Sequence, residues 1–538
     1  MKTLVAFTAG IALLATGLWF GAKHEADTRA APRVAMDPGA SARGAAAFVG
    51  EDFGGLSLAA LESHALPWKL VSAALVLEAQ ADDPDRPATR GTLNARLAEF
   101  GLLPGAAVVN LPAGTGPRPL AKPLGVTFGE ISPIAGAPVE VANLGCAACH
   151  AGVTYDAEGF PRPEAAWIGM PNTSLNLEAY TLALFTALKA HADAPERLLG
   201  MVQTLYPDTG WRERLTLRWL VLPLVQSRLA ETPEDRPLPF PNGVPGATNG
   251  VAALKHVFGL PLIGGGAADA GIVSIPDLGH RHWRSSLLAD GAYAVPGAAR
   301  QVETGPADNT PEKRAALAQI TTFFTVPSMG VHPGAAKAFA QEATDIFEFL
   351  NADYAPQGFP GLTDPAAAAQ GAALYAAECS ACHGSYEITD GRARLLSFPN
   401  WIGDVGTDPL RAEAFSEGLT ASIAGTQYAE TIAVETTGAY VAPPLTGLWA
   451  SAPYLHNGSV PTVWDLLSPQ ARPDRFDVGG HALDFDRLGL AYPGGYQPFS
   501  RPTLYDTRLP GQGNGGHAFG ADLSDAEKRA LIGFLKGL

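Results

Sequence analysis

The feature that most constrains the fold of this chain is a motif that occurs twice, Cys-x-x-Cys-His. Its copies are Cys146-Ala-Ala-Cys149-His150 and Cys379-Ser-Ala-Cys382-His383, and together they use all four cysteines of the 538-residue sequence. Two thiols at this spacing can form thioether bonds to the two vinyl groups of one haem, and the histidine that follows then lies under the iron as an axial ligand. The sequence therefore predicts two covalently bound haem c groups, held through Cys146, Cys149 and His150 and through Cys379, Cys382 and His383.

Other interpretations of the motif fit the sequence less well. A zinc site built on Cys-x-x-Cys has no need of a histidine directly after the second cysteine, and four cysteines in 538 residues are too sparse for a disulfide scaffold. A thioredoxin-like redox pair has no reason to occur twice in one chain. Haem attachment remains the interpretation that uses every residue of both copies.

The N-terminus predicts export. Lys2 is followed by an uncharged stretch, residues 3–22, that is about as long as a membrane-spanning helix needs to be. Because no clear small-residue cleavage site follows it, a membrane anchor is favoured over a cleaved signal peptide within residues 1–34. Either alternative places the body of the protein in the periplasm. A second leucine-rich segment, residues 215–225, is interrupted by Arg218 and Pro223, which predicts a buried helix instead of a membrane span.

Composition excludes several classes of protein. With 47% apolar and 17% charged residues, the chain is neither disordered nor a coiled coil, and 60 Gly with 45 Pro predict long ordered loops around short helices. The net charge of −16, without a basic stripe, argues against a nucleic-acid partner.

The residues around the second motif predict a cytochrome c domain. Asp364 and Pro365 are typical of a helix N-cap and first turn, Gly371 would let another helix cross closely, and Ser524-Asp-Ala-Glu527 forms a capping box before a terminal amphipathic helix. The residues ahead of Cys146, 138–145, look extended instead. We therefore expect a mainly α fold with two cytochrome c-type haem domains and long loops: an enlarged, irregular N-terminal domain over residues 35–350, a linker over 351–363 and a C-terminal cytochrome c domain over 364–538.

The second axial ligand of each haem is less evident. None of the five methionines lies in the C-terminal domain, which excludes a His–Met pair from that domain. His517, in the glycine-rich loop 513–520, is the favoured distal ligand there, with His456 and His481 as alternatives. For the N-terminal haem an open sixth position is at least as well supported as any single residue within range, namely Met170, His191, His256, His280, His282, Met329 and His332.

The segment 442–467, Ala-Pro-Pro-Leu-Thr-Gly-Leu-Trp-Ala-Ser-Ala-Pro-Tyr-Leu-His-Asn-Gly-Ser-Val-Pro-Thr-Val-Trp-Asp-Leu-Leu, resembles the signature of the bacterial di-haem cytochrome c peroxidase/MauG superfamily. Residues 506–520 and the terminal helix resemble the branch that contains the rubber oxygenase RoxA. The resemblance is specific over about residues 340–538 and rests before that on the Cys146 motif, residues 169–172 and the Asp290-Gly291 turn.

The resemblance implies a reactive N-terminal haem with His150 as proximal ligand, and a bis-His C-terminal haem, ligated by His383 and His517, that stores electrons. The tryptophan that the family often places between the haems is Ala289 here, so Trp283 is a weak candidate for that role. Glu303 is a weak candidate for the acid–base group. The family analogy also allows a calcium ion between the domains, although no ligand set for it is evident in the sequence.

These features predict an exported di-haem oxidoreductase, and three functions stay open. The first is a peroxidase, in which H2O2 reacts at the N-terminal haem and a small cytochrome or cupredoxin supplies electrons. The second is an O2-dependent oxygenase that cleaves an apolar substrate. The third is a pure electron-transfer cytochrome with both haem faces closed.

Overall fold

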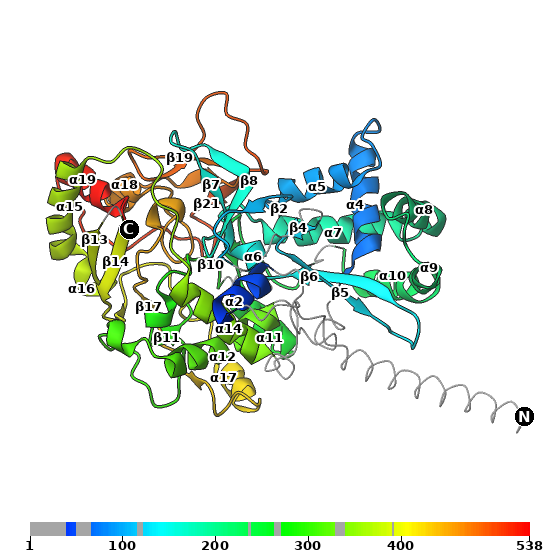
Figure 1. The fold of residues 1–538 in the computed structure, drawn as a ribbon, viewed down its shortest axis with the longest axis horizontal. Helices are drawn as coiled ribbons and strands as arrows, with labels where there is room; N and C mark the ends of the chain where they lie inside the picture. The colour runs from blue at the N-terminus through cyan, green and yellow to red at the C-terminus, as the bar shows by residue number, and fades with distance from the viewer. Residues whose placement is uncertain are drawn as a thin grey trace, which may run out of the picture.

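The computed structural model describes residues 39–49, 66–113, 115, 122–234, 238–262, 271–328, 339–389 and 392–538 (Figure 1). The molecule is elongated, with a lobe of helices at one end and the C-terminal helix at the other. Within the described ranges no helix is both long and apolar enough to cross a membrane. The predicted anchor or signal peptide lies outside those ranges.

The second Cys-x-x-Cys-His motif follows a helix that crosses the C-terminal helix. Helix α15 (Pro365–Glu378) begins at Asp364, whose side chain accepts hydrogen bonds from the backbone N–H groups of Ala366 and Ala367, and helix α19 (Asp525–Leu535) begins with the predicted capping box. A Cβ atom at Gly371 would lie 2.0 Å from the carbonyl oxygen of Ala530, so only glycine permits this crossing. The short helix α16 (Ser380–His383) and the hairpin β13 (Ser385–Thr389) and β14 (Arg392–Ser397) follow directly.

The first motif is built on strands, as the extended residues before Cys146 predicted. Strand β6 (Val139–Leu144) pairs antiparallel with β5 (Val126–Ile131) and with β1 (Leu66–Pro67), and it leads into the turn α6 (Cys146–Cys149). Strands β7 (Ala151–Tyr155) and β8 (Pro161–Ile168) then form a second antiparallel pair, extended by a parallel strand β3 (Ala107–Val108).

Helices pack around the first motif on two sides. One group, at the outer end of the molecule, is formed by α4 (Trp68–Asp82), α5 (Arg90–Glu99), α7 (Leu177–His191), α8 (Pro195–Leu205), α9 (Trp211–Thr216), the π-helical turn η1 (Leu217–Val221) and α10 (Leu222–Glu231) (Figure 1). The other is formed by α2 (Ala40–Val49), α11 (Gly250–Val257), α12 (Pro311–Ser328), α14 (Ala340–Ala352) and α17 (Glu417–Ala424).

The leucine-rich segment 215–225 is helical, but the prediction that it is buried is wrong. Leu215, Trp219 and Leu224 are 49%, 70% and 60% exposed. Its helices bury one face only, because Leu217, Leu222 and Leu229 point into the helical lobe.

Irregular chain connects the two motif regions where the linker was expected, between the end of α14 at Ala352 and the start of α15 at Pro365. One hydrophobic core nevertheless runs through both regions, since Phe48 and Phe349 belong to the same cluster of buried side chains as Trp449 and Leu531.

The remaining elements are short. They are β2 (Leu103–Pro104), β4 (Pro123–Leu124), β9 (Ala247–Thr248), β10 (Val273–Ser274), η3 (Arg281–Trp283), β11 (Ser286–Leu287), β12 (Tyr293–Ala294), η4 (Pro306–Asp308), β15 (Ile402–Gly403), β16 (Ala433–Val434), β17 (Tyr440–Val441), η6 (Leu448–Ala450), α18 (Val463–Leu466), η7 (Pro469–Ala471), β18 (Arg475–Val478), β19 (Ala482–Asp484), β20 (Gly489–Ala491) and β21 (Thr503–Asp506).

Candidate functional site: a cavity shared by both Cys-x-x-Cys-His motifs

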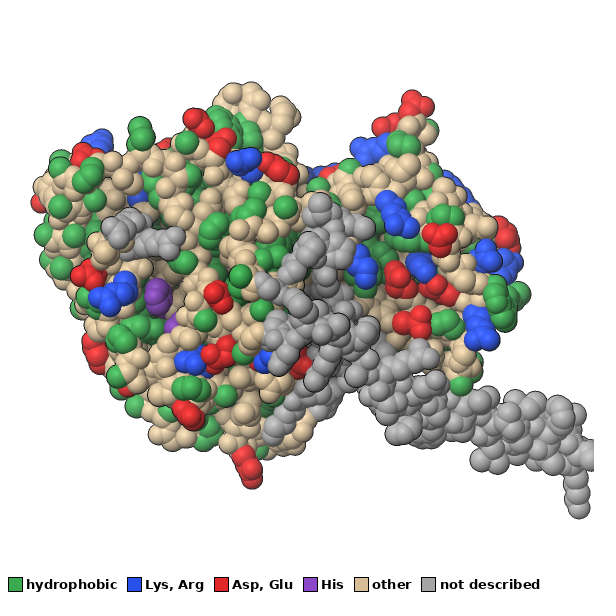
Figure 2. Space-filling view, viewed as in Figure 1, with side chains coloured by type: hydrophobic (Ala, Val, Ile, Leu, Met, Phe, Trp, Pro, Cys, Tyr) green, Lys and Arg blue, Asp and Glu red, His purple; other side chains and the backbone are tan. Residues whose placement is uncertain are grey.

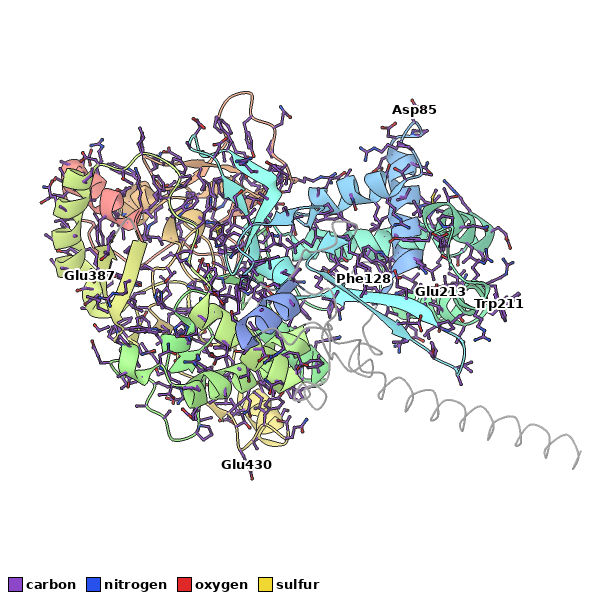
Figure 3. The ribbon with its side chains drawn as sticks, in the orientation of Figure 1. Asp85, Phe128, Trp211, Glu213, Glu387 and Glu430 are labelled. Atoms are coloured by element: carbon purple, nitrogen blue, oxygen red, sulfur yellow. The ribbon has the colours of Figure 1, made fainter. Side chains whose placement is uncertain are left out.

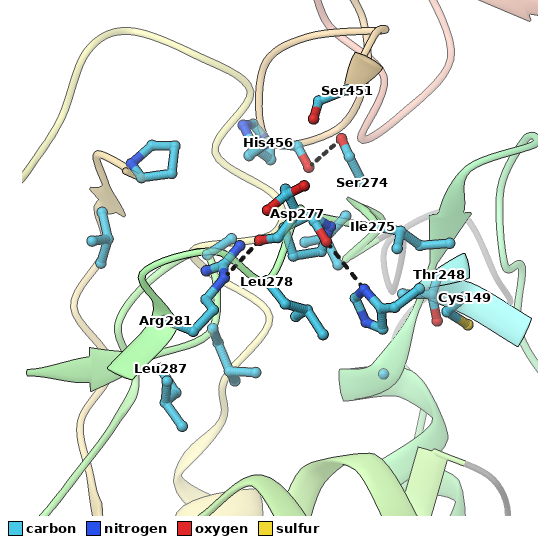
Figure 4. Close-up of a pocket in the computed structure, with 18 of the residues that line it drawn as sticks. Cys149, Thr248, Ser274, Ile275, Asp277, Leu278, Arg281, Leu287, Ser451 and His456 are labelled. Carbon is cyan, nitrogen blue, oxygen red and sulfur yellow. Dashed lines mark hydrogen bonds between the residues drawn. The ribbon is translucent and has the colours of Figure 1, made fainter. Parts of the chain in front are cut away.

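A cavity of about 880 Å³ lies between the two motif regions, and both motifs line it. Cys146, Cys149 and His150 contribute to one part of its wall, and Cys379, Cys382 and His383 to another. The rest of the wall is largely leucine, valine, phenylalanine and proline. The fold therefore brings the six residues that were predicted to hold haem to one continuous, mainly apolar space. Figure 4 shows the part of its wall that includes Cys149 and His456.

Each motif histidine is held by one backbone carbonyl. Nδ1 of His150 lies 3.1 Å from the carbonyl oxygen of Pro276, and Nδ1 of His383 lies 2.8 Å from that of Pro443. A hydrogen bond from Nδ1 fixes the tautomer and leaves Nε2 as the coordinating atom, which is the usual arrangement for a metal-binding histidine. Burial lowers the pKa of His150 to about 4 and also lowers that of His383, so both rings are neutral at pH 7, as coordination requires.

The loops that carry these two carbonyls are joined to each other. Nδ1 of His280 lies 2.7 Å from the hydroxyl oxygen of Thr446. A Cβ atom at Gly279 would lie 2.2 Å from a methyl carbon of Thr446, so the two loops touch at a point where only glycine fits. Loop 276–284 and loop 443–447 thus form one support for both motif histidines.

The thiols fit thioether attachment better than a thiolate metal site. Burial raises the pKa of Cys146 to about 11 and those of Cys149 and Cys379 to about 12, so these thiols stay protonated and are not reactive thiolates. Across the described residues, no group of three or more His, Cys, Asp or Glu side chains could hold a metal ion. This also leaves the calcium expected by family analogy without a described ligand cluster.

His517 lies across the cavity from His383. The centroids of the two rings are 6.3 Å apart. A nitrogen–metal bond of about 2 Å places each imidazole centroid about 3 Å from the metal, so two rings on opposite sides of one iron are about 6 Å apart. The spacing of His383 and His517 therefore fits a haem iron between them.

The backbone of His517 is held firmly in an uncommon conformation. Its φ angle is 47°, in the left-handed region, and its N–H donates to the carbonyl oxygen of Val405 at 2.8 Å. The guanidinium of Arg472 donates to the carbonyl oxygens of Asn514, Gly516 and His517, which ties the whole glycine-rich loop to the domain. The loop thus presents one imidazole at a fixed place.

The two alternative ligands of the second haem lie elsewhere. His456 lines the cavity, but its ring stacks on Tyr440 with centroids 4.0 Å apart. His481 lies outside the cavity wall, fully buried, with Nε2 at 3.3 Å from the hydroxyl oxygen of Thr173.

For the first haem, none of the described candidates for a distal ligand lines the cavity. Met170 is packed beside Gly152, Nε2 of His191 lies 3.2 Å from Glu78, and the ring of His256 contacts Phe240. The remaining described pair, His280 and His282, lines a separate small cavity of about 230 Å³. Met329 and His332 lie outside the described residues.

The two weak candidates from the sequence also lie away from the cavity. Trp283 is buried against Leu395 and Phe398 and lines the small separate cavity. Glu303 is exposed on the surface. Ala289, at the position where the family often has tryptophan, does line the large cavity.

Three arginines in the cavity wall, the buried Arg284 and Arg411 and the half-buried Arg281, were not found from the sequence. Arg411 pairs with Asp290 at 2.5 Å, whereas Arg284 uses one nitrogen on the carbonyl oxygen of Leu288 and leaves its buried Nε without a partner. Burial lowers the pKa of Arg281 to about 10 and that of Arg284 to about 9. A buried guanidinium group in an apolar cavity is costly in free energy unless an anion pairs with it. The carboxylates of haem propionates would supply it, so the residues present fit haem.

One carboxylate in the cavity wall was also missed. Glu342, in the first turn of α14, lies among the apolar residues Phe339, Ala343 and Ile346 that line the same cavity. No sequence motif distinguishes it from the other glutamates, because its place in the wall depends on how α14 packs.

Comparison with known proteins supports the haem interpretation. Residues 439–477 match a family model described as RoxA-like, cytochrome c-like. This match includes Tyr440, Pro443 and His456 of the cavity wall, and it supports the RoxA-like branch of the resemblance. A cytochrome c-like domain implies covalently bound haem c and a haem-containing oxidoreductase.

Two relatives come from Sinorhizobium fredii (strain NBRC 101917 / NGR234), and both are named as uncharacterised proteins. The first, y4iJ, is 32% identical over a region that covers 34% of this chain and 40% of the relative. The second, y4iM, is also 32% identical and covers 30% of this chain and 43% of the relative. The chain thus spans less than half the length of the curated relatives it matches.

Proposed function

We propose that the chain is an exported di-haem c-type oxidoreductase with one reactive and one closed haem. The pairing of His383 with His517 at 6.3 Å carries this proposal, together with the absence of Met170, His191, His256, His280 and His282, the described distal candidates for the His150 haem, from the cavity wall. Haem whose iron has two histidine ligands passes electrons, whereas haem with an open position binds dioxygen or peroxide. The division of labour is thus an N-terminal reactive site and a C-terminal electron store, in two cytochrome c-type domains.

The reaction we favour is oxidation of an apolar substrate by dioxygen. Leucine, valine and phenylalanine side chains from α7, α11 and α14 line the cavity that contains the first motif, for example Leu184, Leu254 and Phe347. Such a wall excludes water and binds hydrocarbon by burial of apolar surface. The RoxA-like match at 439–477 agrees with this choice. When bound, the haem supplies the oxygen chemistry, and the chain supplies the dry pocket and the electrostatic setting.

A peroxidase is the second candidate, and Glu342 favours it. A carboxylate in the wall of this cavity could move a proton to or from peroxide, which is the acid–base role that peroxide cleavage requires. In that case a small cytochrome or cupredoxin would deliver electrons to the C-terminal domain. A pure electron-transfer cytochrome would instead need a distal ligand to His150, which Met329, His332 or the cavity-wall residue His456 would have to provide.

Low-temperature EPR of the ferric, haem-loaded full chain tests the proposal. We expect one low-spin signal from the His383 haem and a second signal, from the His150 haem, that is high-spin or changes when a small ligand is added. The variant His517→Ala should gain a new high-spin signal, while His456→Ala, the matched control in the same cavity, should not. Two low-spin signals that no ligand alters would contradict the reactive-haem assignment.

The same samples separate oxygenase from peroxidase. With an oxygenase, product forms from a polyisoprenoid and O2, and Glu342→Gln leaves the rate of that reaction nearly unchanged. With a peroxidase, H2O2 oxidises a reduced cytochrome. Glu342→Gln then slows this oxidation by about 10²-fold or more, the usual contribution of a positioned acid or base.

A further inference from the structure

A row of large apolar side chains points to solvent from α9, η1 and α10. Trp211, Leu215 and Trp219 are spaced four residues apart and so lie on one side of the helices. They are 63%, 49% and 70% exposed, and Leu224 continues the row at 60%. Figure 3 places Trp211 at the outer end of the helical lobe. We call these four residues the Trp211–Leu224 row.

The helices that carry the row are firmly attached to the lobe. Their opposite face buries Leu217, Leu222 and Leu229 in the lobe's core. The carboxylate of Glu213 accepts a hydrogen bond from Lys69 at 2.5 Å and another from the backbone N–H of Glu140 at 3.0 Å. The opposite face of α9, η1 and α10 is therefore already packed against the lobe. The Trp211–Leu224 row stays exposed and can contact a partner.

Basic side chains surround the row in a chain that is acidic overall. Between Trp211 and Glu231 there are Arg212, Arg214, Arg218 and Arg228 but only two glutamates, whereas the whole chain carries −16. Glu213 is engaged with Lys69 and Arg218 is paired with Glu196 of α8, which leaves Arg212, Arg214 and Arg228 on this segment. The guanidinium of Arg212 lies 5.4 Å from the ring centroid of Trp211, and that of Arg218 lies 5.3 Å from Trp219. Figure 2 shows hydrophobic, basic and acidic side chains side by side at this end of the molecule.

We propose that the Trp211–Leu224 row rests on the surface of a lipid bilayer that contains anionic lipids. Tryptophan prefers the interface between water and hydrocarbon, and arginine beside it pairs with anionic headgroups while its stem covers apolar surface. The uncharged stretch 3–22 is the predicted membrane anchor. The 16 residues between it and Gly39 can span at most on the order of 50 Å, so an anchored body stays close to the membrane surface.

Other occupants explain the surface less well. An isologous contact between two copies of the chain would place the arginine clusters of both copies opposite each other, which is unfavourable. A neutral apolar polymer would bury the tryptophans but gain nothing from Arg212, Arg214 and Arg228. An anionic bilayer satisfies both features at once.

Hydroxyl-radical footprinting of the haem-loaded full chain tests the proposal, because it reads the exposure of single tryptophans by mass spectrometry. Oxidation of Trp211 and Trp219 should be lost on vesicles with anionic phospholipid and retained on neutral vesicles or in high salt. Phe160, exposed but remote in sequence, serves as internal control, and its labelling should not change.

Two sets of variants sharpen the result. Arg212→Gln with Arg214→Gln should shift the docked population about 25-fold toward the undocked one, because each basic residue near an anionic surface contributes about five-fold. The matched control, Arg162→Gln with Arg394→Gln, removes two arginines that are also exposed but lie elsewhere and should change nothing.

Three outcomes would overturn the proposal. The first is unchanged oxidation of both tryptophans on anionic vesicles that carry the protein. The second is protection by a polyisoprene emulsion but not by vesicles, which would assign the row to substrate recognition. The third is protection that rises with protein concentration in the absence of lipid, which would assign it to self-association.

Discussion

Arg284 is buried at a position where its charge lacks a full counterion in the protein. Burial is the main reason that its pKa falls to about 9, the nearby Arg281 lowers it further, and Asp290 only partly offsets this. A cation held close to a haem iron favours the ferrous form, which carries one positive charge less. Individual side chains in this cavity thus set the electrostatic surroundings of the cofactor that the chain is predicted to bind.

We predict that Arg284→Gln lowers the reduction potential of at least one haem. Spectroelectrochemical titration of the haem-loaded protein measures this shift. Arg300→Gln is the control, because Arg300 pairs with Glu435 outside the cavity wall and its loss should leave both potentials unchanged. Equal potentials in the wild type and in Arg284→Gln would contradict the propionate role.

Burial of His481 leads to a prediction about how the free energy of unfolding depends on pH, and this prediction does not involve the proposed haem ligands. Burial lowers the pKa of His481 to about 3, from an ordinary value of 6.5, so the folded protein keeps this ring neutral. Below pH 6.5 the unfolded chain binds a proton that the folded chain does not, so the free energy of unfolding falls as the pH falls, down to about pH 3.

We therefore expect His481→Gln to remove part of the acid sensitivity. Between pH 6.5 and pH 5 the wild type should lose on the order of 2 kcal/mol of unfolding free energy through His481, at about 1.4 kcal/mol per pH unit, and the variant should not show this loss. Denaturant unfolding at both pH values measures it. An identical pH dependence in both proteins would show that another group controls acid unfolding.

Among the elements, the crossing of α15 and α19 is the most sharply determined. Gly371 of α15 lies directly against the backbone of α19 at Ala530, whereas Gly533 of α19 has room, since a Cβ there would lie 3.6 Å from Ala367. The two glycines sit in the same helix pair and differ mainly in this clearance.

Gly371→Ala should therefore destabilise the protein by roughly 1–3 kcal/mol or more through overpacking. Gly533→Ala should be neutral or stabilise it by about 0.5–1 kcal/mol, because alanine favours a helix interior over glycine. Thermal unfolding followed at a haem absorption band and by circular dichroism compares the two. Equal effects would mean that the helices can separate to accept a side chain.

The sequence predicted elements well where the signals were local. Asp364, Gly371 and the Ser524 capping box lie within one helix pair, so their meaning could be recognised without the rest of the fold. The strand before Cys146 was likewise visible as an extended segment. Arg284, Arg411 and Glu342 were missed because they are distant in the chain and gain their role only when loops and α14 pack around one cavity.

The incorrect prediction for residues 215–225 has a different cause. The hydropathy of Leu215, Trp219 and Leu224 indicates that these side chains favour an apolar environment. It does not indicate whether that environment is the core of the protein or the surface of a partner. A helix with apolar side chains on two faces can bury one in its own core and offer the other to a partner. Here the buried face was predicted and the exposed one was not.

At the scale of the whole molecule, the cavity links the stability of the two halves. Its wall takes residues from both motif regions, and one hydrophobic core runs through them. Covalently attached haem would pack against its apolar wall and supply counter-charge to the buried arginines. The folded state should therefore depend on haem attachment.

We predict that the chain lacking either haem is less stable in both halves. Cys146→Ala with Cys149→Ala, and Cys379→Ala with Cys382→Ala, should each lower the melting temperature and expose loops 276–284 and 443–447 to protease. Limited proteolysis with mass spectrometry locates the cuts. If each variant were cut only beside its own motif, the two halves would be energetically independent.

The joined loops under the two motif histidines have a consequence for how the protein can evolve. Pro276 and Pro443 set the basicity of His150 and His383, and the contact between His280 and Thr446 ties their loops together. A substitution that displaces one of these loops is expected to disturb the other through that contact. In the di-haem enzyme proposed above, the affinities of the two irons for an electron would then shift together, and the difference between them would change less than either value.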